Sequence, residues 1–223
     1  MDAVGLLGAV LPATVTAVAR LSDDDDAPLH PSEEAAVARA VASRRAEFTT
    51  GRWCAREALA ALGAPAEAIP VGEERAPVWP AGVVGSITHT RGFRGAAVAW
   101  RSTVRSVGID AEVHDVLPDR VLDVVSSETE RALLERLSSA RPDVAWDRLL
   151  FSAKESVYKT WFPLTGRWLG FEDAELVPSE DGTFTTRLLV EGPTVDGAVV
   201  ESFVGRWAVA DGILVTAIAL PAR

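Results

Sequence analysis

The order of the predicted helices and strands constrains the fold of this chain more than any other feature of its sequence. A long, interrupted helical region is expected from Ser32 to about Leu62, where Gly63 and Pro65 end it. Alternating apolar residues then predict three strands, over residues 83–88, 96–100 and 104–113. Two more helices are expected over 127–138 and 145–161, and three antiparallel strands over 183–190, 199–209 and 213–220. Helices followed by strands therefore occur twice.

This repeated order predicts an α+β protein of two lobes, residues 1–104 and 105–223, which divide near Arg101–Arg105. In the first lobe, Ser32 is the expected N-cap of the helical region. A turn through Arg91–Gly95 is expected to join the first two strands.

Composition excludes several classes of function. The net charge of −10 argues against nucleic-acid binding, which depends on Lys and Arg neutralising phosphates. The single cysteine, Cys54, excludes an internal disulfide and, with no recognisable export signal, predicts a cytoplasmic protein. Glycine and proline interrupt the apolar segment Ala3–Ala19, which is interpreted as buried structure rather than a signal peptide or membrane span. The acidic run Asp23–Asp26 is typical of a solvated loop.

Lysine is confined to one short segment. Of 22 basic residues, only Lys154 and Lys159 are lysines, and they lie five positions apart. An ammonium and a guanidinium are not interchangeable, so this confinement indicates that a compact charge is needed there. The alternative is chance in a lysine-poor chain.

Two acids lie on one face of the predicted strand 104–113. Side chains alternate along a strand, so Asp110 and Glu112 point the same way, about 7 Å apart, opposite Ile109. Gly108 on the same face is expected to leave room for a ligand. Two carboxylates suit a hard cation such as magnesium, which completes its coordination with water and substrate phosphates. The alternative is a solvent-facing pair of acids on an edge strand.

The predicted helix 145–161 carries a third acid. Leu149, Ala153 and Val157 recur every four residues and form its buried stripe. Glu155 faces away from that stripe, and Lys159 lies one turn beyond it, so the two are expected to pair. The alternative is an ordinary surface ion pair.

Arginines lie beside the buried stripe of the first helical region. Arg44 and Arg52 are at the margins of that stripe, where they either cover apolar surface with their stems or reach into a cleft to bind phosphate. Gly51 in mid-helix indicates a break or a close approach. Thr88 and His89 end the first strand with groups suited to phosphate or ribose oxygens.

These motifs, in this order, resemble one family. Gly108-Ile-Asp-x-Glu112, followed by Phe151-Ser-x-Lys-Glu-Ser-x-Tyr-Lys159, is similar to the 4′-phosphopantetheinyl transferases. The segments from Arg44 to Ala55 and from Trp79 to His89 resemble the branch that includes the enterobactin synthase D component and actinobacterial relatives. The resemblance implies a pseudo-twofold pair of α+β lobes, with coenzyme A and Mg²⁺ in the cleft between them.

The resemblance also implies roles for individual residues. Magnesium would be held by Asp110, Glu112 and Glu155, with the Ala111 carbonyl nearby, and Glu155 would be the base. The coenzyme A contacts that it implies are Arg44, Arg52, Thr88 and His89 for phosphate and ribose, Lys159 for the diphosphate, and the loop of Gly72, Glu74 and Arg75 for the adenine. Relatives often have lysine in that loop, where this chain has Val71-Gly-Glu-Glu-Arg75.

The reaction implied is transfer of phosphopantetheine from coenzyme A to a serine of apo acyl or peptidyl carrier proteins, in fatty-acid, polyketide, nonribosomal-peptide or siderophore synthesis. One alternative is another Mg-dependent phosphotransferase acting on a nucleotide-like substrate, although the P-loop and kinase signatures are absent from the sequence. The other is a coenzyme A binding protein without catalytic activity.

Overall fold

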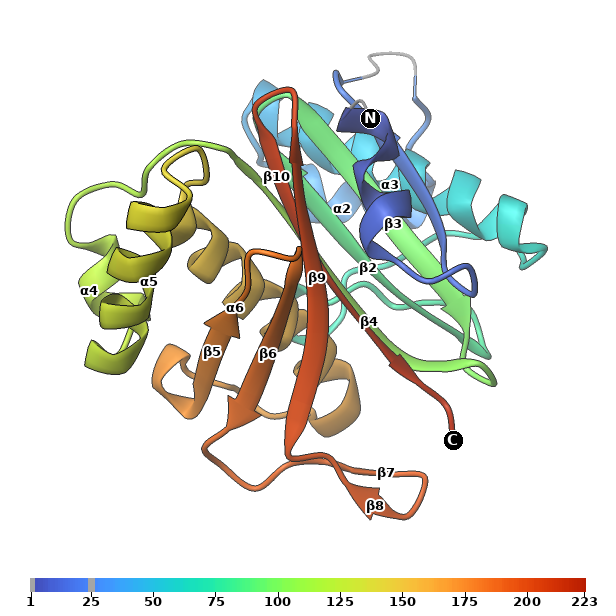
Figure 1. The fold of residues 1–223 in the computed structure, drawn as a ribbon. Helices are drawn as coiled ribbons and strands as arrows, with labels where there is room; N and C mark the ends of the chain where they lie inside the picture. The colour runs from blue at the N-terminus through green and yellow to red at the C-terminus, as the bar shows by residue number, and fades with distance from the viewer. Residues whose placement is uncertain (1–2, 24–26) are drawn as a thin grey trace.

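The computed structural model describes residues 3–23 and 27–223, and its N-terminal part forms a three-stranded sheet covered by a long helix (Figure 1). Its elements are η1 (Ala3–Gly5), α1 (Leu6–Val10), β1 (Thr16–Arg20), α2 (Pro31–Val37), α3 (Ala42–Leu62), η2 (Glu73–Arg75), β2 (Val83–Thr90) and β3 (Phe93–Trp100). The strands are antiparallel in the order β1-β3-β2. Cys54, Ala58 and Leu59 of α3 pack on Ala96 and Val98 of β3.

The C-terminal part forms a five-stranded antiparallel sheet in the order β4-β10-β9-β6-β5, with α6 across one face. Its elements are β4 (Val104–Val113), α4 (Val121–Val125), α5 (Glu128–Ala140), α6 (Trp146–Thr165), η3 (Phe171–Asp173), β5 (Ala174–Pro178), β6 (Thr183–Leu188), β7 (Thr194–Val195), β8 (Ala198–Val199), β9 (Ser202–Ala210) and β10 (Ile213–Pro221). Trp146, Trp161 and Phe184 are fully buried in the core beneath α6. The predicted α+β class is confirmed.

A third core cluster connects the two sheets. Leu6 and Leu7 of α1 pack in the same cluster as Ile109 of β4 and Val215 of β10. Strands β2 and β4 lie side by side and are linked by side chains: the Ser86 hydroxyl accepts the Ile109 N–H at 3.2 Å, and the Thr88 hydroxyl accepts the Ala111 N–H at 2.8 Å. The junction of the sheets therefore brings the motif residues of both halves together.

The predicted helical region is two helices, and its cap was predicted wrongly. His30 is the N-cap of α2: its Nδ1 accepts the Ser32 N–H, and the Glu33 carboxylate returns to the His30 N–H at 3.0 Å. Pro31 occupies the first helical position, where its missing N–H costs nothing, so Ser32 lies inside the helix. Gly51 does not break α3. It instead allows α3 to approach β2 closely, since a Cβ at this position would lie 3.3 Å from Ile87.

The turn between β2 and β3 is Arg91–Gly92 alone, not Arg91–Gly95. Arg94 is buried within β3 because Asp23 binds its guanidinium at 2.8 Å. Gly95 lies within β3, where the lack of a side chain lets Leu7 pack against the strand: a Cβ at Gly95 would lie 2.8 Å from Leu7. Both partners are distant in the sequence, which explains the wrong prediction. Of the acidic run Asp23–Asp26, only Asp23 lies within the described residues.

Other boundaries also differ from the prediction. Helix α6 continues past residue 161 to Thr165, β6 ends at Leu188, and β9 begins at Ser202 rather than at 199. The short elements β1, α4 and β5 were not predicted. Strand β4 has the predicted bounds, and Ser127 is the N-cap of α5. Within the described residues, no helix is long and apolar enough to cross a membrane.

Candidate functional site

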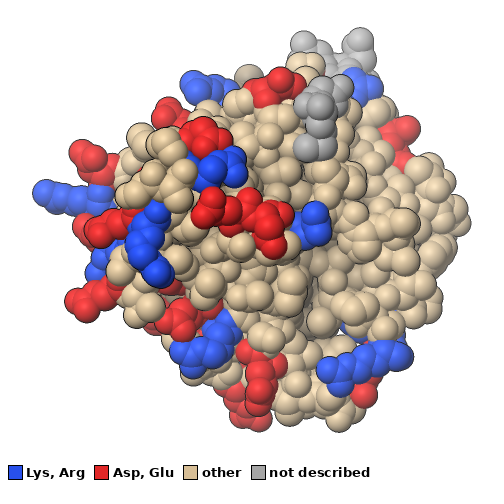
Figure 2. All heavy atoms as spheres, viewed as in Figure 1, with Lys and Arg blue, Asp and Glu red and all other residues tan. Residues whose placement is uncertain are grey.

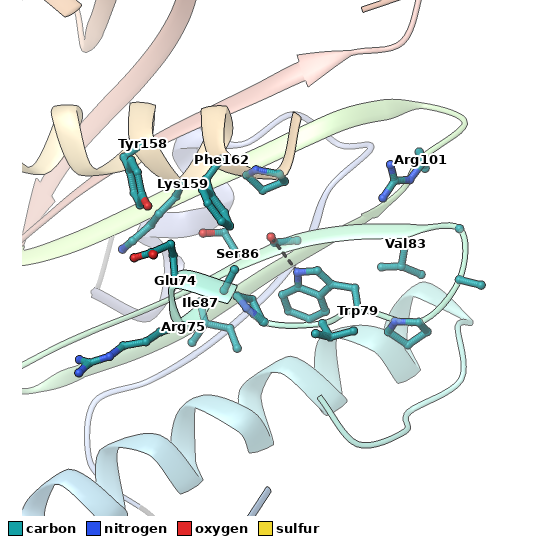
Figure 3. Close-up of a pocket in the computed structure, with 18 of the residues that line it drawn as sticks. Glu74, Arg75, Trp79, Val83, Ser86, Ile87, Arg101, Tyr158, Lys159 and Phe162 are labelled. Atoms are coloured by element: carbon teal, nitrogen blue, oxygen red, sulfur yellow. Dashed lines mark hydrogen bonds between the residues drawn. The ribbon is translucent and has the colours of Figure 1, made fainter. Parts of the chain in front are cut away.

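Three neighbouring cavities lie around α6 and β2, and the largest, the central cavity, has a volume of about 580 Å³ (Figure 3). Figure 3 shows Tyr158, Lys159 and Phe162 reaching from α6 toward Glu74 and Ser86 on the opposite wall. Glu155 also lines the central cavity. Helix α6 therefore presents an acid, a lysine and two aromatic rings to the central cavity: Glu155, Lys159, Tyr158 and Phe162.

A second cavity, of about 520 Å³, adjoins the central cavity and is called the arginine cavity here. The two share Arg75, Pro77 and Ile87 in their walls, so they lie next to each other. The arginine cavity is lined by Arg44 and Arg52 of α3 together with His89 of β2, among other residues. Three of the predicted phosphate-binding residues are thus brought together.

Arg52 is a buried cation that forms no ion pair with the described carboxylates. Its residue is 5% exposed, its guanidinium carbon lies 4.5 Å from the centre of the Phe48 ring, and its Nε has no hydrogen-bond partner among the described residues. Burial lowers the pKa of Arg52 to about 10, although the charge of Glu33 opposes the shift. Glu33 is bonded to Arg56 instead. A buried guanidinium with an unused donor at a cavity wall fits an anionic ligand.

The His89 ring is held with Nε2 as a hydrogen-bond acceptor. Arg44 Nη1 lies 2.6 Å from His89 Nε2, so the ring nitrogen accepts from the guanidinium, while Glu47 lies 3.6 Å from Nδ1. Burial lowers the pKa of His89, and the charge of Arg44 lowers it further. An anion in this cavity would favour the protonated ring.

The loop before β2 is closed by its own backbone. Gly72 N–H donates to Ala76 O at 2.8 Å, and Val71 and Pro77 form an isolated bridge. Glu74 and Arg75 have positive φ, which is uncommon for side-chain-bearing residues, and both line the central cavity. This loop therefore offers Glu74 and Arg75 between the central and arginine cavities.

Asp110 is 6% exposed and is held from three sides. Lys159 Nζ lies 2.7 Å from its Oδ1, the Ser152 hydroxyl donates to its Oδ2 at 2.8 Å, and the Thr88 hydroxyl lies 3.4 Å from its Oδ1. The alternative of a solvent-facing acid is therefore wrong for Asp110. Thr88 lines none of the three cavities and instead joins Asp110 to the Ala111 backbone.

Glu112 and Glu155 lie within electrostatic reach of Asp110. Arg148 Nη1 pairs with Glu112 at 3.1 Å. Burial raises the pKa of Glu112, and the Asp110 charge raises it further. Burial also raises the pKa of Glu155; the charge of Lys159 opposes that shift, and the charge of Asp110 adds to it. The expected Glu155–Lys159 ion pair is not formed, because Lys159 binds Asp110.

The side cavity, of about 260 Å³, meets the central cavity at Glu155 and Tyr158. Its other wall includes Trp168 and Phe171. The Tyr158 hydroxyl is buried and has no hydrogen-bond partner, and the ring lies 5.1 Å from that of Trp168. Tyr158 therefore lies at the boundary of two cavities, with a hydroxyl that no described residue binds.

The two lysines have different environments. Lys154 is 4% exposed in its side chain and pairs with the buried Glu130 at 3.0 Å; it lies outside the central cavity and in the wall of the side cavity. Gly108 leaves no room for a ligand, contrary to the prediction: a Cβ there would lie 2.1 Å from the Ser156 carbonyl of α6. Helix α6 therefore lies directly against β4, and this contact brings Lys159 to Asp110.

The three carboxylates are of the type that magnesium prefers, but no group of three His, Cys, Asp or Glu side chains among the described residues is arranged as metal ligands. The Asp110 charge raises the pKa of both Glu112 and Glu155, and a divalent cation relieves such repulsion. Lys159 and Arg148 neutralise two of the acids. A metal would have to displace these protein cations.

Two family models match consecutive parts of the chain. The model described as the 4′-phosphopantetheinyl transferase N-terminal domain matches residues 32–99. The model described as the 4′-phosphopantetheinyl transferase superfamily matches residues 106–210. The residues of the arginine cavity fall in the first match, and Asp110, Glu112 and Glu155 fall in the second.

Individual relatives support the same family. The chain is 53% identical to the 4′-phosphopantetheinyl transferase Svp of Streptomyces mobaraensis, over 97% of this chain and 90% of the relative. It is 50% identical to the 4′-phosphopantetheinyl transferase PptT of Mycobacterium tuberculosis, over 96% of this chain and 98% of the relative. A weaker match, 34% identity over 65% of this chain and 56% of the relative, is to enterobactin synthase component D of Salmonella typhi.

Proposed function

Because this chain belongs to the 4′-phosphopantetheinyl transferase superfamily, we propose that the central and arginine cavities form its coenzyme A site. The protein is an enzyme that transfers the phosphopantetheine arm of coenzyme A to carrier proteins. The assignment of the site rests on one observation: the buried Arg52, which pairs with no carboxylate in the described part of the chain, lines a cavity that adjoins the one lined by Lys159 and Glu155.

Coenzyme A is proposed to lie across the arginine and central cavities. Arg44, Arg52 and His89, contributed by residues 1–104, would hold the 3′-phosphate, since their charges and donors converge there without a bound carboxylate on Arg52. The loop of Gly72, Glu74 and Arg75 would border the adenine, with Arg75 in place of the lysine often found there in relatives.

Residues 105–223 are proposed to carry the chemistry. Lys159 would leave Asp110 and bind the diphosphate as coenzyme A enters. The carrier serine oxygen attacks the β-phosphorus, its proton passes to Glu155, and the bond to adenosine 3′,5′-bisphosphate breaks. Burial raises the pKa of Glu155, which favours its role as a base near neutral pH.

Magnesium would be held by Asp110, Glu112 and Glu155, with the Ala111 carbonyl nearby, and would supply charge neutralisation on the diphosphate. Asp110 already accepts from Ser152 and Thr88, so its carboxylate is oriented before any ligand binds. Phosphoryl transfer depends mainly on such positioning and charge neutralisation.

The carriers are proposed to be apo acyl or peptidyl carrier proteins of fatty-acid, polyketide, nonribosomal-peptide or siderophore synthesis. The buried, unpaired Cys54 is compatible with the proposed cytoplasmic location.

The proposal is tested by incubating the protein with apo carrier protein, coenzyme A and Mg²⁺, and measuring the intact mass of the carrier. We expect the addition of one phosphopantetheine, which stops when the metal is chelated. Asp110→Ala should abolish this transfer and leave the circular dichroism spectrum unchanged. Normal turnover by that variant contradicts the metal assignment. Binding of coenzyme A with no mass change at all indicates a non-catalytic binding protein, and phosphoryl transfer to another acceptor indicates a different phosphotransferase.

A further inference from the structure

A row of buried hydroxyl groups lies behind Asp110. Ser152 and Ser156 are on α6, Thr216 is on β10, and all three are fully buried. Ser156 Oγ lies 2.7 Å from Thr216 Oγ1, which lies 3.0 Å from Ser152 Oγ. Ser152 Oγ lies 2.8 Å from Asp110 Oδ2. The row therefore ends on a proposed metal ligand.

The carboxylate fixes the direction of the hydrogen bond at this end of the row. A carboxylate that pairs with Lys159 can only accept, so the Ser152 proton points to Asp110 and the Ser152 oxygen is left to accept. Thr216 donates to the Ser152 backbone carbonyl at 2.9 Å, and its hydroxyl oxygen lies 3.0 Å from Ser152 Oγ. Ser156 has two acceptors on Thr216, the carbonyl at 3.2 Å and the hydroxyl at 2.7 Å.

This row occupies one oxygen of Asp110 and leaves the other for the site. Oδ2 is bound by Ser152 inside the protein, whereas Oδ1 faces Lys159, whose side chain lines the central cavity. The side chain of serine is short, and it reaches Asp110 only because α6 lies directly on β4 at Gly108. The carboxylate is therefore held in one orientation by the packing of helix on strand.

We propose that Ser152 is a positioning residue, which orients Asp110 so that it offers Oδ1 alone to the metal. The proposal deepens the proposed function and rests on its metal assignment. Ser152 acts through Asp110, since it does not line the three cavities. Its loss leaves Asp110 held through Oδ1 only, by Lys159 and Thr88, and leaves Oδ2 without its buried donor.

The chain offers a matched control one turn along the same helix. Ser156 is equally buried and bonds the same Thr216 hydroxyl, but it does not contact Asp110. Ser152→Ala and Ser156→Ala each remove one buried hydroxyl, so a merely structural role predicts similar effects. A positioning role predicts that only Ser152→Ala strongly changes metal binding.

The measurement is Mn²⁺ affinity by electron paramagnetic resonance, with thermal unfolding and kcat recorded alongside. Ser152→Ala should weaken Mn²⁺ binding about 10–100-fold, whereas Ser156→Ala should leave it close to wild type. Ser152→Thr, which keeps the hydroxyl, should restore most of the affinity. If Ser152→Ala does not fold, Thr216→Val, which keeps the side-chain shape, must weaken Mn²⁺ binding more than Ser156→Ala does.

Equal effects of Ser152→Ala and Ser156→Ala on Mn²⁺ affinity overturn the positioning role and leave the metal assignment intact. A wild-type protein that transfers phosphopantetheine but binds no Mn²⁺ overturns the metal assignment and, with it, this proposal.

Discussion

Lys154 and Lys159 lie on the same helix, but they serve different regions of the molecule. Lys154 points into the C-terminal core, where it pairs with Glu130 and donates to the carbonyls of Phe171 and Ala174. Lys159 is 27% exposed in its side chain, lines the central cavity and pairs with Asp110. Five positions turn a helix by about 140° beyond a full turn, so the two cannot share a face.

The buried ammonium of Lys154 and the half-buried ammonium of Lys159 differ in whether they can bind a ligand. Glu130 is held by Lys154, by the Ser127 N–H and by the Leu176 N–H, so that pair is satisfied within the protein and has no oxygen to offer a ligand. Lys159 has open space beside it and can exchange Asp110 for a phosphate. In the proposed site, the first lysine supports the fold and the second would support transfer.

Lys159→Met gives the largest expected effect. Loss of the ammonium removes a charge that stabilises the diphosphate, so kcat should fall about 10²–10³-fold. The free energy of unfolding should change little, because Asp110 keeps its bonds to Ser152 and Thr88. Carrier labelling by mass spectrometry and urea unfolding measure the two quantities. Lys159→Met with wild-type kcat contradicts the role of Lys159.

Lys154→Met should instead lower stability and leave turnover unchanged. It leaves the charge of Glu130 buried without its partner, so the free energy of unfolding should fall by about 3–5 kcal/mol. The kcat of the folded protein should stay near wild type. Adding Glu130→Gln should recover part of the loss in urea unfolding. A Lys154→Met variant that is as stable as wild type but inactive would remove the distinction between the two lysines.

The same contrast applies to the arginines of α3. Arg52 is buried at the arginine cavity, and Arg45 is exposed outside it. Arg52→Gln should raise KM for coenzyme A about 10-fold or more, because a charged hydrogen bond to the 3′-phosphate is lost. It should have little effect with 3′-dephospho-coenzyme A, and Arg45→Gln should have little effect with either substrate. Equal losses with both substrates would contradict the 3′-phosphate assignment.

The smallest expected effect is a shift in pH dependence. Burial raises the pKa of Glu155, and Lys159 opposes this, so Lys159→Met should raise the pKa of Glu155 further. The proposed base acts when ionised, and activity is lost as pH falls through its pKa. The acid limb of the kcat profile should therefore move to higher pH in Lys159→Met and stay in place in Lys154→Met. A shift toward lower pH would exclude Glu155 as the base.

Local sequence patterns were enough to predict strand β4 and the acids on it. The roles of the two lysines depend on partners that are distant in the sequence. Strand β4 and the acids on it followed from alternation, which depends on neighbouring residues alone. The partner of Lys154 is Glu130 on another helix, and the partner of Lys159 is Asp110 on a strand. The sequence singled out both lysines but contained no local signal to separate their roles.

The site residues that sequence reasoning missed are also defined by tertiary contacts. Arg148 pairs with Glu112, and Ser152 contacts Asp110, only because α6 lies on β4. Gly108 was expected to admit a ligand and instead admits the helix backbone. The distribution of charge over the surface also depends on the tertiary structure. Figure 2 shows acidic and basic side chains gathered toward the α4–α5 end of one face, which the net charge alone does not predict.

In the proposed site, metal and diphosphate bind at Asp110, beside Lys159. Isothermal titration of Mg²⁺ into the protein saturated with coenzyme A tests this assignment, with Lys154→Met as the control for altered folding. We expect a single Mg²⁺ site in the wild type and in folded Lys154→Met, and no binding in Asp110→Ala. Wild-type Mg²⁺ affinity in Asp110→Ala would contradict the assignment.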